Sequence, residues 1–205
     1  MAEGLGVSTG NLQRIAMSSQ NAQLENAKVL LGISGGIAAY KAADLASKLT
    51  GAGAQVRTIM TANACRLITP ACLQALTRQP VYTTMWAEAE AFTIGHIELA
   101  DWADAVVVAP ATANILAKIA AGICDDLLST TLCVCWNKPV LLAPAMNSRM
   151  WANPIVQENL ARIQDRLKFR TLGPDTGRLA CGTEGVGRMA EPAAILDAVK
   201  QLLHS

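Results

Sequence analysis

Hydrophobic positions along the chain fall into short continuous runs, and segments with helical spacing separate these runs. Runs this short, bounded by turn residues, indicate buried strands. The expected strands cover residues 28–33, 55–60, 104–110 and 138–144, with an edge strand at 168–172. Apolar residues at helical spacing predict helices over residues 37–49, 69–78, 114–122, 125–134, 154–167 and 193–203.

This alternation of strands and helices predicts an α/β fold, a parallel sheet covered by helices on both faces. We expect residues 27–205 to form one domain, and the small polar residues 1–26 to form a mobile tail with a short helix near Leu12–Met17. Ligands of such sheets bind beyond the carboxyl ends of the strands. Four segments fall there: residues 34–37, 61–63, 110–114 and 144–151.

Composition narrows the function classes. The net charge is +1, so no broad basic surface invites nucleic acid. The apolar runs are far shorter than the ~20 residues of a membrane helix, and we expect neither a membrane span nor a signal peptide. With no C-x-x-C pair and only two histidines, a metal site is not expected, and the six cysteines read as free thiols of a cytoplasmic protein.

The segment "GISGGIAAYK" resembles a nucleotide-binding turn, but Gly32, Gly35 and Gly36 do not give the G-x-G-x-x-G spacing of dinucleotide sites. No acidic residue follows the second strand to hold a ribose. A glycine turn into a helix still offers backbone N–H groups to a phosphate, and Thr61 and Thr112 add hydroxyls. This set favours a mononucleotide such as FMN. Glycines that serve only the turn geometry are an equally good interpretation.

Three further positions are candidates for chemistry. His96 is able to exchange a proton near neutral pH, or it caps the helix that follows. Asn147 can donate hydrogen bonds to a substrate carboxylate, or it satisfies the backbone of its own loop. Its neighbours Met146 and Met150 line an apolar wall or belong to the core. Cys181 lies in "GRLACGTEGVGRMAEP", which is either a flap that closes over a ligand or a surface loop, since its glycines do not suit a helix or strand interior.

Five segments occur together in one order: "GISGGIAAYK", "GHIELADWAD", "APATANILAKIAAGICDDLL", "PAMNSRMW" and "LACGTEGVGRMAEP". In these, the chain resembles the flavin-dependent cysteine decarboxylases, most closely the branch that serves coenzyme A biosynthesis, from about Lys28 to Leu203. The resemblance implies a flavodoxin-like fold, which is three-layer α/β/α and Rossmann-like. It also implies FMN as cofactor, and trimers or dodecamers with active sites between subunits.

The resemblance also implies roles for residues at the matching positions. His96 matches the active-site histidine, Asn147 the residue that holds the substrate carboxylate, and Cys181 the cysteine of a substrate clamp. The clamp and its surroundings contribute Met150, Ala180 and Arg188 to substrate binding. The positions around the flavin are Ser34, Gly35, Gly36, Ile37, Thr61, Ala111, Thr112, Asn114 and Met146.

The activity that the resemblance implies is FMN-dependent decarboxylation of 4′-phospho-N-pantothenoylcysteine to 4′-phosphopantetheine. The substrate thiol is oxidised to a thioaldehyde, carbon dioxide leaves, and the enethiolate is reduced again while Cys181 supplies a proton. Many bacterial relatives carry a synthetase in the same chain, and since this sequence ends at Ser205 we expect that second activity to be absent.

Three alternatives stay open at this stage. A decarboxylase of C-terminal peptidyl cysteine shares His96 and the Asn147 loop but stops at the enethiol, and the intact cysteine flap argues against it. A non-catalytic regulatory subunit usually loses the histidine, asparagine or cysteine, and this chain keeps all three. An electron carrier of the flavodoxin type is usually strongly acidic, which a net charge of +1 does not fit.

Overall fold

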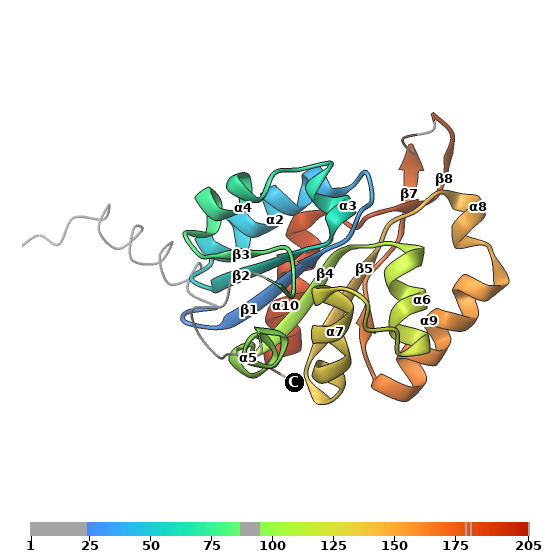
Figure 1. Cartoon of the computed structure of the whole chain (residues 1–205). Helices are drawn as coiled ribbons and strands as arrows, with labels where there is room; N and C mark the ends of the chain where they lie inside the picture. The colour runs from blue at the N-terminus through green and yellow to red at the C-terminus, as the bar shows by residue number, and fades with distance from the viewer. Residues whose placement is uncertain (1–23, 87–94, 179, 181, 205) are drawn as a thin grey trace, which may run out of the picture.

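The computed structural model describes residues 24–86, 95–178, 180 and 182–204. Six parallel strands form the main sheet, in the order β3-β2-β1-β4-β5-β6 (Figure 1). They are β1 (Lys28–Ile33), β2 (Gln55–Met60), β3 (Val81–Tyr82), β4 (Ala105–Ala111), β5 (Val140–Pro144) and β6 (Arg170–Thr171). A separate antiparallel hairpin consists of β7 (Asp175–Arg178) and β8 (Glu184–Arg188).

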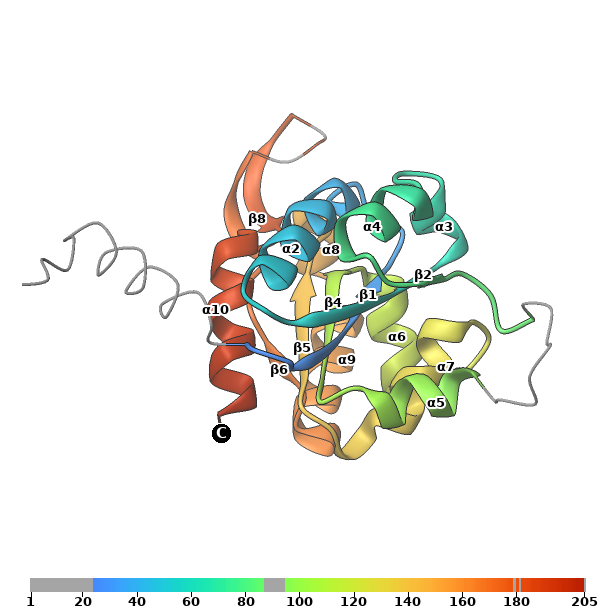
Figure 2. The same cartoon turned by 90° about the vertical axis from the view of Figure 1, so that its left-hand side faces the viewer.

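Helices connect the strands and cover both faces of the sheet. They are α2 (Ala39–Gly51), α3 (Ala62–Cys65), α4 (Pro70–Thr77), α5 (Gly95–Trp102), α6 (Ala113–Ala121), α7 (Leu127–Val134), the 3-10 turn η1 (Cys135–Asn137), α8 (Ser148–Trp151), α9 (Pro154–Leu167) and α10 (Pro192–Leu203). Figure 2 shows α2, α4 and α10 on one side of the sheet, with α5, α7 and α9 on the other. The predicted three-layer α/β/α fold is confirmed.

Strand order fixes where a ligand can bind. The chain steps outward from β1 to β2 and β3, then returns to the other side of β1 with β4 and steps outward again to β5 and β6. Without the short edge strand β3, this is the flavodoxin order; with β3 included, it is the Rossmann order. The direction reverses between β1 and β4, so the loops after these two strands diverge and leave a crevice at the carboxyl edge of the sheet.

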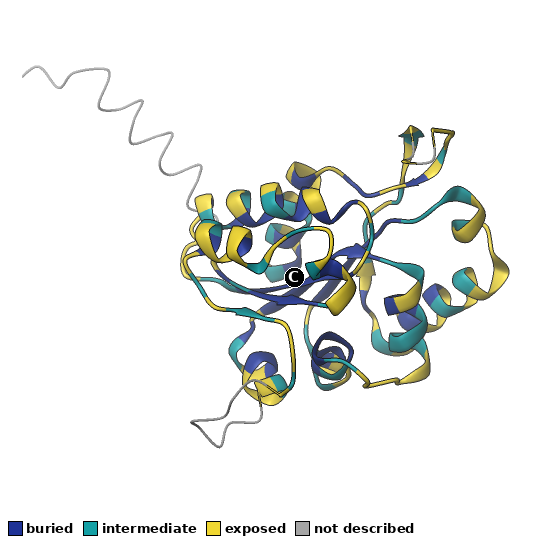
Figure 3. Cartoon of the chain, turned by 45° about the horizontal axis from the view of Figure 1, so that its top comes forward, coloured by how far each residue is buried: buried dark blue, intermediate teal, exposed yellow. Residues whose placement is uncertain are grey.

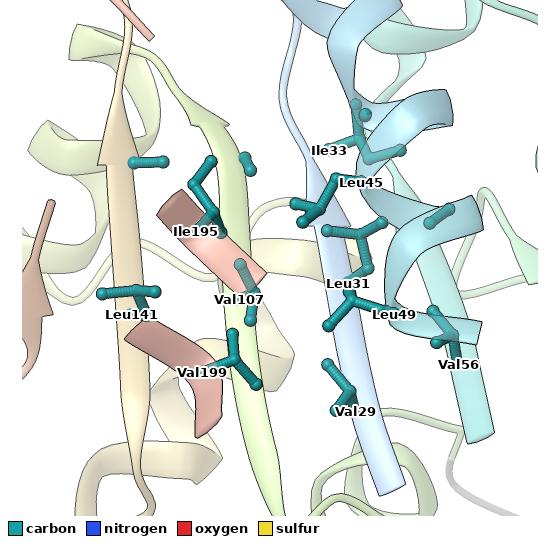
Figure 4. Close-up of a cluster of buried hydrophobic side chains, with 14 of the residues drawn as sticks. Val29, Leu31, Ile33, Leu45, Leu49, Val56, Val107, Leu141, Ile195 and Val199 are labelled. Atoms are coloured by element: carbon teal, nitrogen blue, oxygen red, sulfur yellow. The ribbon is translucent and has the colours of Figure 1, made fainter. Parts of the chain in front are cut away.

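Two apolar cores lie on the two faces of the sheet because side chains alternate along each strand. Val29, Leu31 and Ile33 of β1 lie in the core with α2 and α10, and Figure 4 shows Leu31 and Ile33 near Leu45 and Leu49 of α2. Leu30 points to the opposite face, into the core formed with α5, α6, α7 and α9. A fully buried side chain of this size contributes about 1.5–3 kcal/mol, so both layers stabilise the sheet strongly. Figure 3 shows the buried sheet between helices whose outer faces are exposed.

Several expectations need correction. The glycine-rich segment that was expected to hold no strand contributes to the β7–β8 hairpin, and Gly177, Gly185 and Gly187 lie within its strands. A two-stranded ribbon with one face over a cavity tolerates glycine, whereas a packed central strand does not. Leu24, within the segment predicted to be a tail, is buried in the core. The helix predicted near Leu12–Met17 lies outside the described residues.

Membrane-spanning helices and metal-binding clusters can be looked for only in the described residues. None of their helices combines the length and the apolar character that a bilayer crossing requires. Over the same residues, no cluster of three metal-ligating side chains occurs. The five cysteines in this part of the chain are free thiols.

Candidate functional site

A cavity of about 970 Å³ opens at the carboxyl edge of the sheet, at the reversal point between β1 and β4. This volume lies near the upper end of the range that small-molecule and cofactor sites span. The loops after β1, β2, β4 and β5 form its floor and sides, and the β7–β8 hairpin forms a further wall. Of the predicted site residues, it is lined by Ser34, Gly35, Gly36, Ile37, Thr61, Thr112, Asn114, Met146, Asn147, Met150, Ala180 and Arg188.

Ser34 ties the two diverging loops together. Its buried hydroxyl donates to the Pro110 carbonyl at 2.7 Å, and it accepts from the Thr112 backbone N–H at 3.1 Å. Thr112 in turn caps α6, because its Oγ1 accepts from the Ile115 N–H at 3.4 Å. Thr112, whose hydroxyl was predicted to face a phosphate, therefore helps Ser34 to hold the rim of the cavity in place.

The glycine turn is required by packing. A Cβ on Gly35 would lie 2.3 Å from the Cβ of Asn63, in the short helix α3 that follows β2, and a Cβ on Gly36 would lie 3.0 Å from the Thr112 Cγ2. The turn thus brings the β1, β2 and β4 loops into contact. The geometric interpretation of these glycines is confirmed. A phosphate role, which the same turn at the start of α2 permits, stays a prediction.

Asn147 sits at the junction of β5 and α8, and it caps that short helix. Its side-chain oxygen accepts from the Arg149 backbone N–H at 2.8 Å. The loop-capping interpretation is therefore confirmed for the carbonyl end of the side chain. Because the oxygen is fixed on the helix, the orientation of the amide NH2 is fixed with it, in a side chain that lines the cavity beside Met146 and Met150.

The hairpin is docked onto the same loop. The Met146 N–H donates to the Gly187 carbonyl at 2.9 Å, and a Cβ on Gly187 would lie 2.1 Å from the Met146 oxygen. Only glycine allows this approach. The contact places Arg188 and Ala180 on the cavity wall, together with Arg178. Cys181 itself lies outside the described residues.

Two charged clusters flank the cavity. On one side the Lys41 ammonium, almost buried, pairs with Glu191 at 3.0 Å and donates to the Met189 carbonyl at 3.3 Å, and Arg188 pairs with the same Glu191. These cations, Lys41 first, lower the pKa of Glu191. On the other side Lys118 pairs with Asp125 and Asp126, each at 2.6 Å. Burial lowers the pKa of Lys118, but the two carboxylates outweigh it and the net shift is upward.

Several lining residues were not predicted from the sequence, among them Tyr40, Lys41, Lys118 and Asp126. A signal for two of them was present. Tyr40 and Lys41 follow the glycine turn directly, and the first turn of a helix that starts at a ligand-binding edge also faces the ligand. Lys118 and Asp126 carried no such signal, because their approach to the cavity depends on how α6 and α7 pack.

Two predicted residues do not line this cavity. Ala111 is buried at the end of β4, so its side chain belongs to the core. His96 lies in the first turn of α5, inside the helix rather than before it, and it is absent from the cavity wall. The helix-capping interpretation of His96 is therefore wrong. Within one chain, the structure does not bring His96 together with Asn147.

Comparison with known proteins assigns the family. The profile of the family described as "Flavoprotein" matches residues 17–204, a range that includes all of the described residues. The chain belongs to the Flavoprotein family. Its cofactor class is therefore a flavin.

Individual relatives refine this assignment. The coenzyme A biosynthesis bifunctional protein CoaBC of Bacillus subtilis is 50% identical over 174 residues, which are 84% of this chain and 42% of that protein. The chain thus spans less than half of this relative. A solved structure of a cysteine-to-serine variant of PPC decarboxylase, complexed with pantothenoylaminoethenethiol, is 36% identical with a TM-score of 0.79, and the match covers 88% of this chain and all of that one.

A second flavoprotein structure, the FMN binding protein AtHal3, is also 36% identical, with a TM-score of 0.75 over 86% of this chain and 96% of that one. The resemblance first inferred from five short segments is therefore confirmed along the whole domain. The glycine turn, the Asn147 loop and the hairpin are far apart in the sequence, and their residues line one cavity of this flavoprotein.

Proposed function

We propose that this flavoprotein binds FMN and decarboxylates 4′-phospho-N-pantothenoylcysteine to 4′-phosphopantetheine, a step of coenzyme A biosynthesis. One observation carries the proposal. The Asn147 loop and the glycine turn line one cavity, in a chain that matches PPC decarboxylase over that relative's full length. The five described cysteines are free thiols, so we place the protein in a reducing compartment, the cytoplasm.

The cavity fits FMN in three respects. The N-termini of α2 and α6 both open at its rim, and helix N-termini favour a phosphate. The segment after β2, Thr61–Asn63, offers no carboxylate for the second ribose of a dinucleotide. Met146 and Ile37 supply apolar surface for a flavin ring. When bound, FMN supplies a reversible two-electron acceptor for the substrate thiol, which makes the neighbouring carboxylate able to leave as carbon dioxide.

The residues of this chain would then orient the substrate and control water and protons. The Asn147 NH2 group donates to the substrate carboxylate without adding a charge, so the carboxylate is held but not strongly stabilised. Met146 and Met150 exclude water from the reacting carbon atoms. Cys181, assigned from its sequence motif alone, supplies the proton that the enethiolate carbon needs.

His96 completes the site only if a second subunit provides it. We propose a homotrimer, or a dodecamer built from trimers, in which the α5 helix of one subunit faces the cavity of its neighbour. Large apolar side chains beside this region support an interface: Trp86 is 84% exposed and Ile97 is 41% exposed. Single-chain surfaces with such side chains commonly mark association sites.

Mixing two inactive variants tests the shared site. In a homo-oligomer with sites between subunits, His96→Asn subunits co-expressed with Asn147→Asp subunits form some sites that carry both native residues. Activity recovered by the mixture, with light scattering that gives a trimer or a multiple of it, supports the proposal. A mixture as inactive as its parents, or a monomer that is fully active, contradicts it.

The reaction itself is tested by product mass. Purified protein with FMN is incubated with phosphopantothenoylcysteine, and the expected product has lost carbon dioxide alone. A product that has lost carbon dioxide and two hydrogens is the enethiol, and it would indicate the peptide-type oxidative reaction instead. We expect Cys181→Ser to release or retain the enethiol; normal yields of phosphopantetheine from that variant would remove Cys181 from the mechanism. Unchanged substrate with native protein would overturn the proposed function.

A further inference from the structure

The wall of the cavity formed by α2 and the hairpin carries an excess of positive charge. Lys41, Arg178 and Arg188 line it, and Glu191 is the carboxylate that pairs with Lys41 and Arg188. Glu184 stands opposite Arg178 in the hairpin register, yet the described residues include no ion pair of Arg178. On the opposite wall, Lys118 is outweighed by Asp125 and Asp126. An anionic group of a ligand is therefore drawn to the hairpin side.

The guanidinium of Arg188 is held in place from two directions. Its side chain lies across Gly177 of the paired strand, where a Cβ would come within 3.3 Å of its Nη1. Its Nη2 donates to Glu191. A guanidinium has five N–H donors, so the pairing with Glu191 leaves the group able to bind an anion as well.

The buried Lys41 leaves the cluster of Lys41, Arg188 and Glu191 with a net positive charge. Glu191 alone would neutralise Arg188, but Lys41 lies 3.0 Å from the same carboxylate, so the three groups together carry a net positive charge. The same two cations lower the pKa of Glu191 and keep it ionised at neutral pH. Lys41 and Glu191 thus hold the side chain of Arg188 in position at the edge of the cavity, near the Asn147 loop.

We propose that Arg178 and Arg188 form the subsite for the phosphate group of the substrate, with Lys41 and Glu191 positioning Arg188. The inference rests on the proposed function and adds to it which part of the substrate the hairpin selects. Asn147 and the flavin turn bind the reacting end, while the hairpin arginines bind the far, phosphorylated end. Selection of a phosphorylated small molecule over a peptide would then come from the hairpin.

The test compares a phosphorylated and an unphosphorylated substrate. In Arg188→Gln and, separately, Arg178→Gln, we expect KM for phosphopantothenoylcysteine to rise about 10- to 100-fold with kcat within about twofold, since a charge-assisted contact is lost. KM for pantothenoylcysteine should stay within about twofold. Arg149→Gln is the matched control, because Arg149 is exposed on α8 at the same rim and does not line the cavity.

Three outcomes would overturn the proposal. If KM rises equally for both substrates, the arginines act on the cysteine end that the two substrates share, or on the fold. If the Kd for FMN rises while that for riboflavin does not, they hold the cofactor phosphate. If Arg149→Gln has the same effect, only bulk charge matters. Calorimetry on the FMN-loaded protein separates the phosphate subsite from the proposed decarboxylase function, because it compares the Kd of phosphopantetheine with that of pantetheine and needs no turnover. If Arg188→Gln loses the preference for the phosphorylated ligand, the subsite is supported even if the native protein turns over neither substrate.

Discussion

Gly187 and Met146 are in direct backbone contact: the Met146 N–H donates to the Gly187 carbonyl at 2.9 Å, and no Cβ would fit at Gly187. This contact joins a hairpin from late in the sequence to the loop that carries Asn147. It therefore fixes the position of Asn147, the residue proposed to bind the substrate carboxylate, relative to the hairpin arginines. The site depends on a pair of residues that have no catalytic chemistry of their own.

Replacing Gly187 with Ala should separate the hairpin from the Asn147 loop. The Cβ would lie 2.1 Å from the Met146 oxygen, and the φ of 154° is unfavourable for alanine. We expect kcat/KM to fall at least about 10-fold, because a displacement of ~1 Å in a positioned site costs about that much or more. The control is Gly51→Ala, where nothing lies within 4 Å. A Gly187→Ala enzyme with native kcat/KM would contradict the role of the contact.

The substitution Asn147→Asp should distinguish the role of Asn147 in helix capping, measured as thermal stability, from its role in substrate binding, measured as kcat/KM. Aspartate caps a helix as well as asparagine does, so thermal stability should change little. The new charge repels the substrate carboxylate, and we expect kcat/KM to fall at least about 100-fold, as for loss of a charge-assisted contact plus repulsion. Asn153→Asp is the matched control, since Asn153 caps α9 in the same way, at 2.9 Å from the Ile155 N–H, and lies outside the cavity. Equal losses in both variants would assign the effect to capping.

Thr58→Val should stabilise the protein. Thr58 is fully buried in β2, and its hydroxyl has no hydrogen-bond partner among the described residues. Removing an unsatisfied buried hydroxyl should raise the free energy of unfolding by about 1 kcal/mol, measured by urea denaturation. Thr77→Val is the contrasting change, because its buried hydroxyl donates to the Leu73 carbonyl at 2.9 Å, and it should destabilise. A loss of stability in Thr58→Val would show that its hydroxyl is satisfied.

The cysteines should differ in their reaction with iodoacetamide. Burial raises the pKa of Cys135 to about 11, so its thiolate is scarce below that pH, and the side chain is also inaccessible. Cys72 and Cys133 are exposed. At pH 8, peptide mass spectrometry should find Cys72 and Cys133 alkylated while Cys135 stays unmodified until the protein unfolds. Early modification of Cys135 in folded protein would show that α7 opens locally.

The same thiol makes stability depend on alkaline pH. The pKa of Cys135 is raised above its unfolded value of 9.0, so the folded state retains a proton that the unfolded state releases. The contribution is fully present below pH 9 and decreases as the pH rises toward 11. Urea midpoints measured across this interval should fall more in the native protein than in Cys135→Ala, and parallel curves would contradict the shift.

Features that depend on residues close together in the sequence were predicted, and features that depend on residues far apart in the sequence were not. The strands and helices depend on apolar residues at period 2 or 3.6, which neighbours along the chain display directly, and β1, β2 and α9 have the predicted bounds. The prediction that the glycine-rich segment holds no strand was wrong, because what makes glycine suitable there, such as the close approach of the Met146 backbone to Gly187, comes from a distant part of the chain. The short elements β3, α3 and α8 carried too few residues to show a period.

The sequence alone therefore determined the fold class, the carboxyl edge as the binding edge, and the motif residues of a flavin site, because periodicity and short motifs are local properties of the chain. Tertiary structure decided which of those residues share a cavity. It brought Lys41, Arg188 and Glu191 together and left His96 away from the cavity of its own chain. Ion pairs and cavity walls join residues distant in sequence, so their geometry exists only after the helices have packed on the sheet.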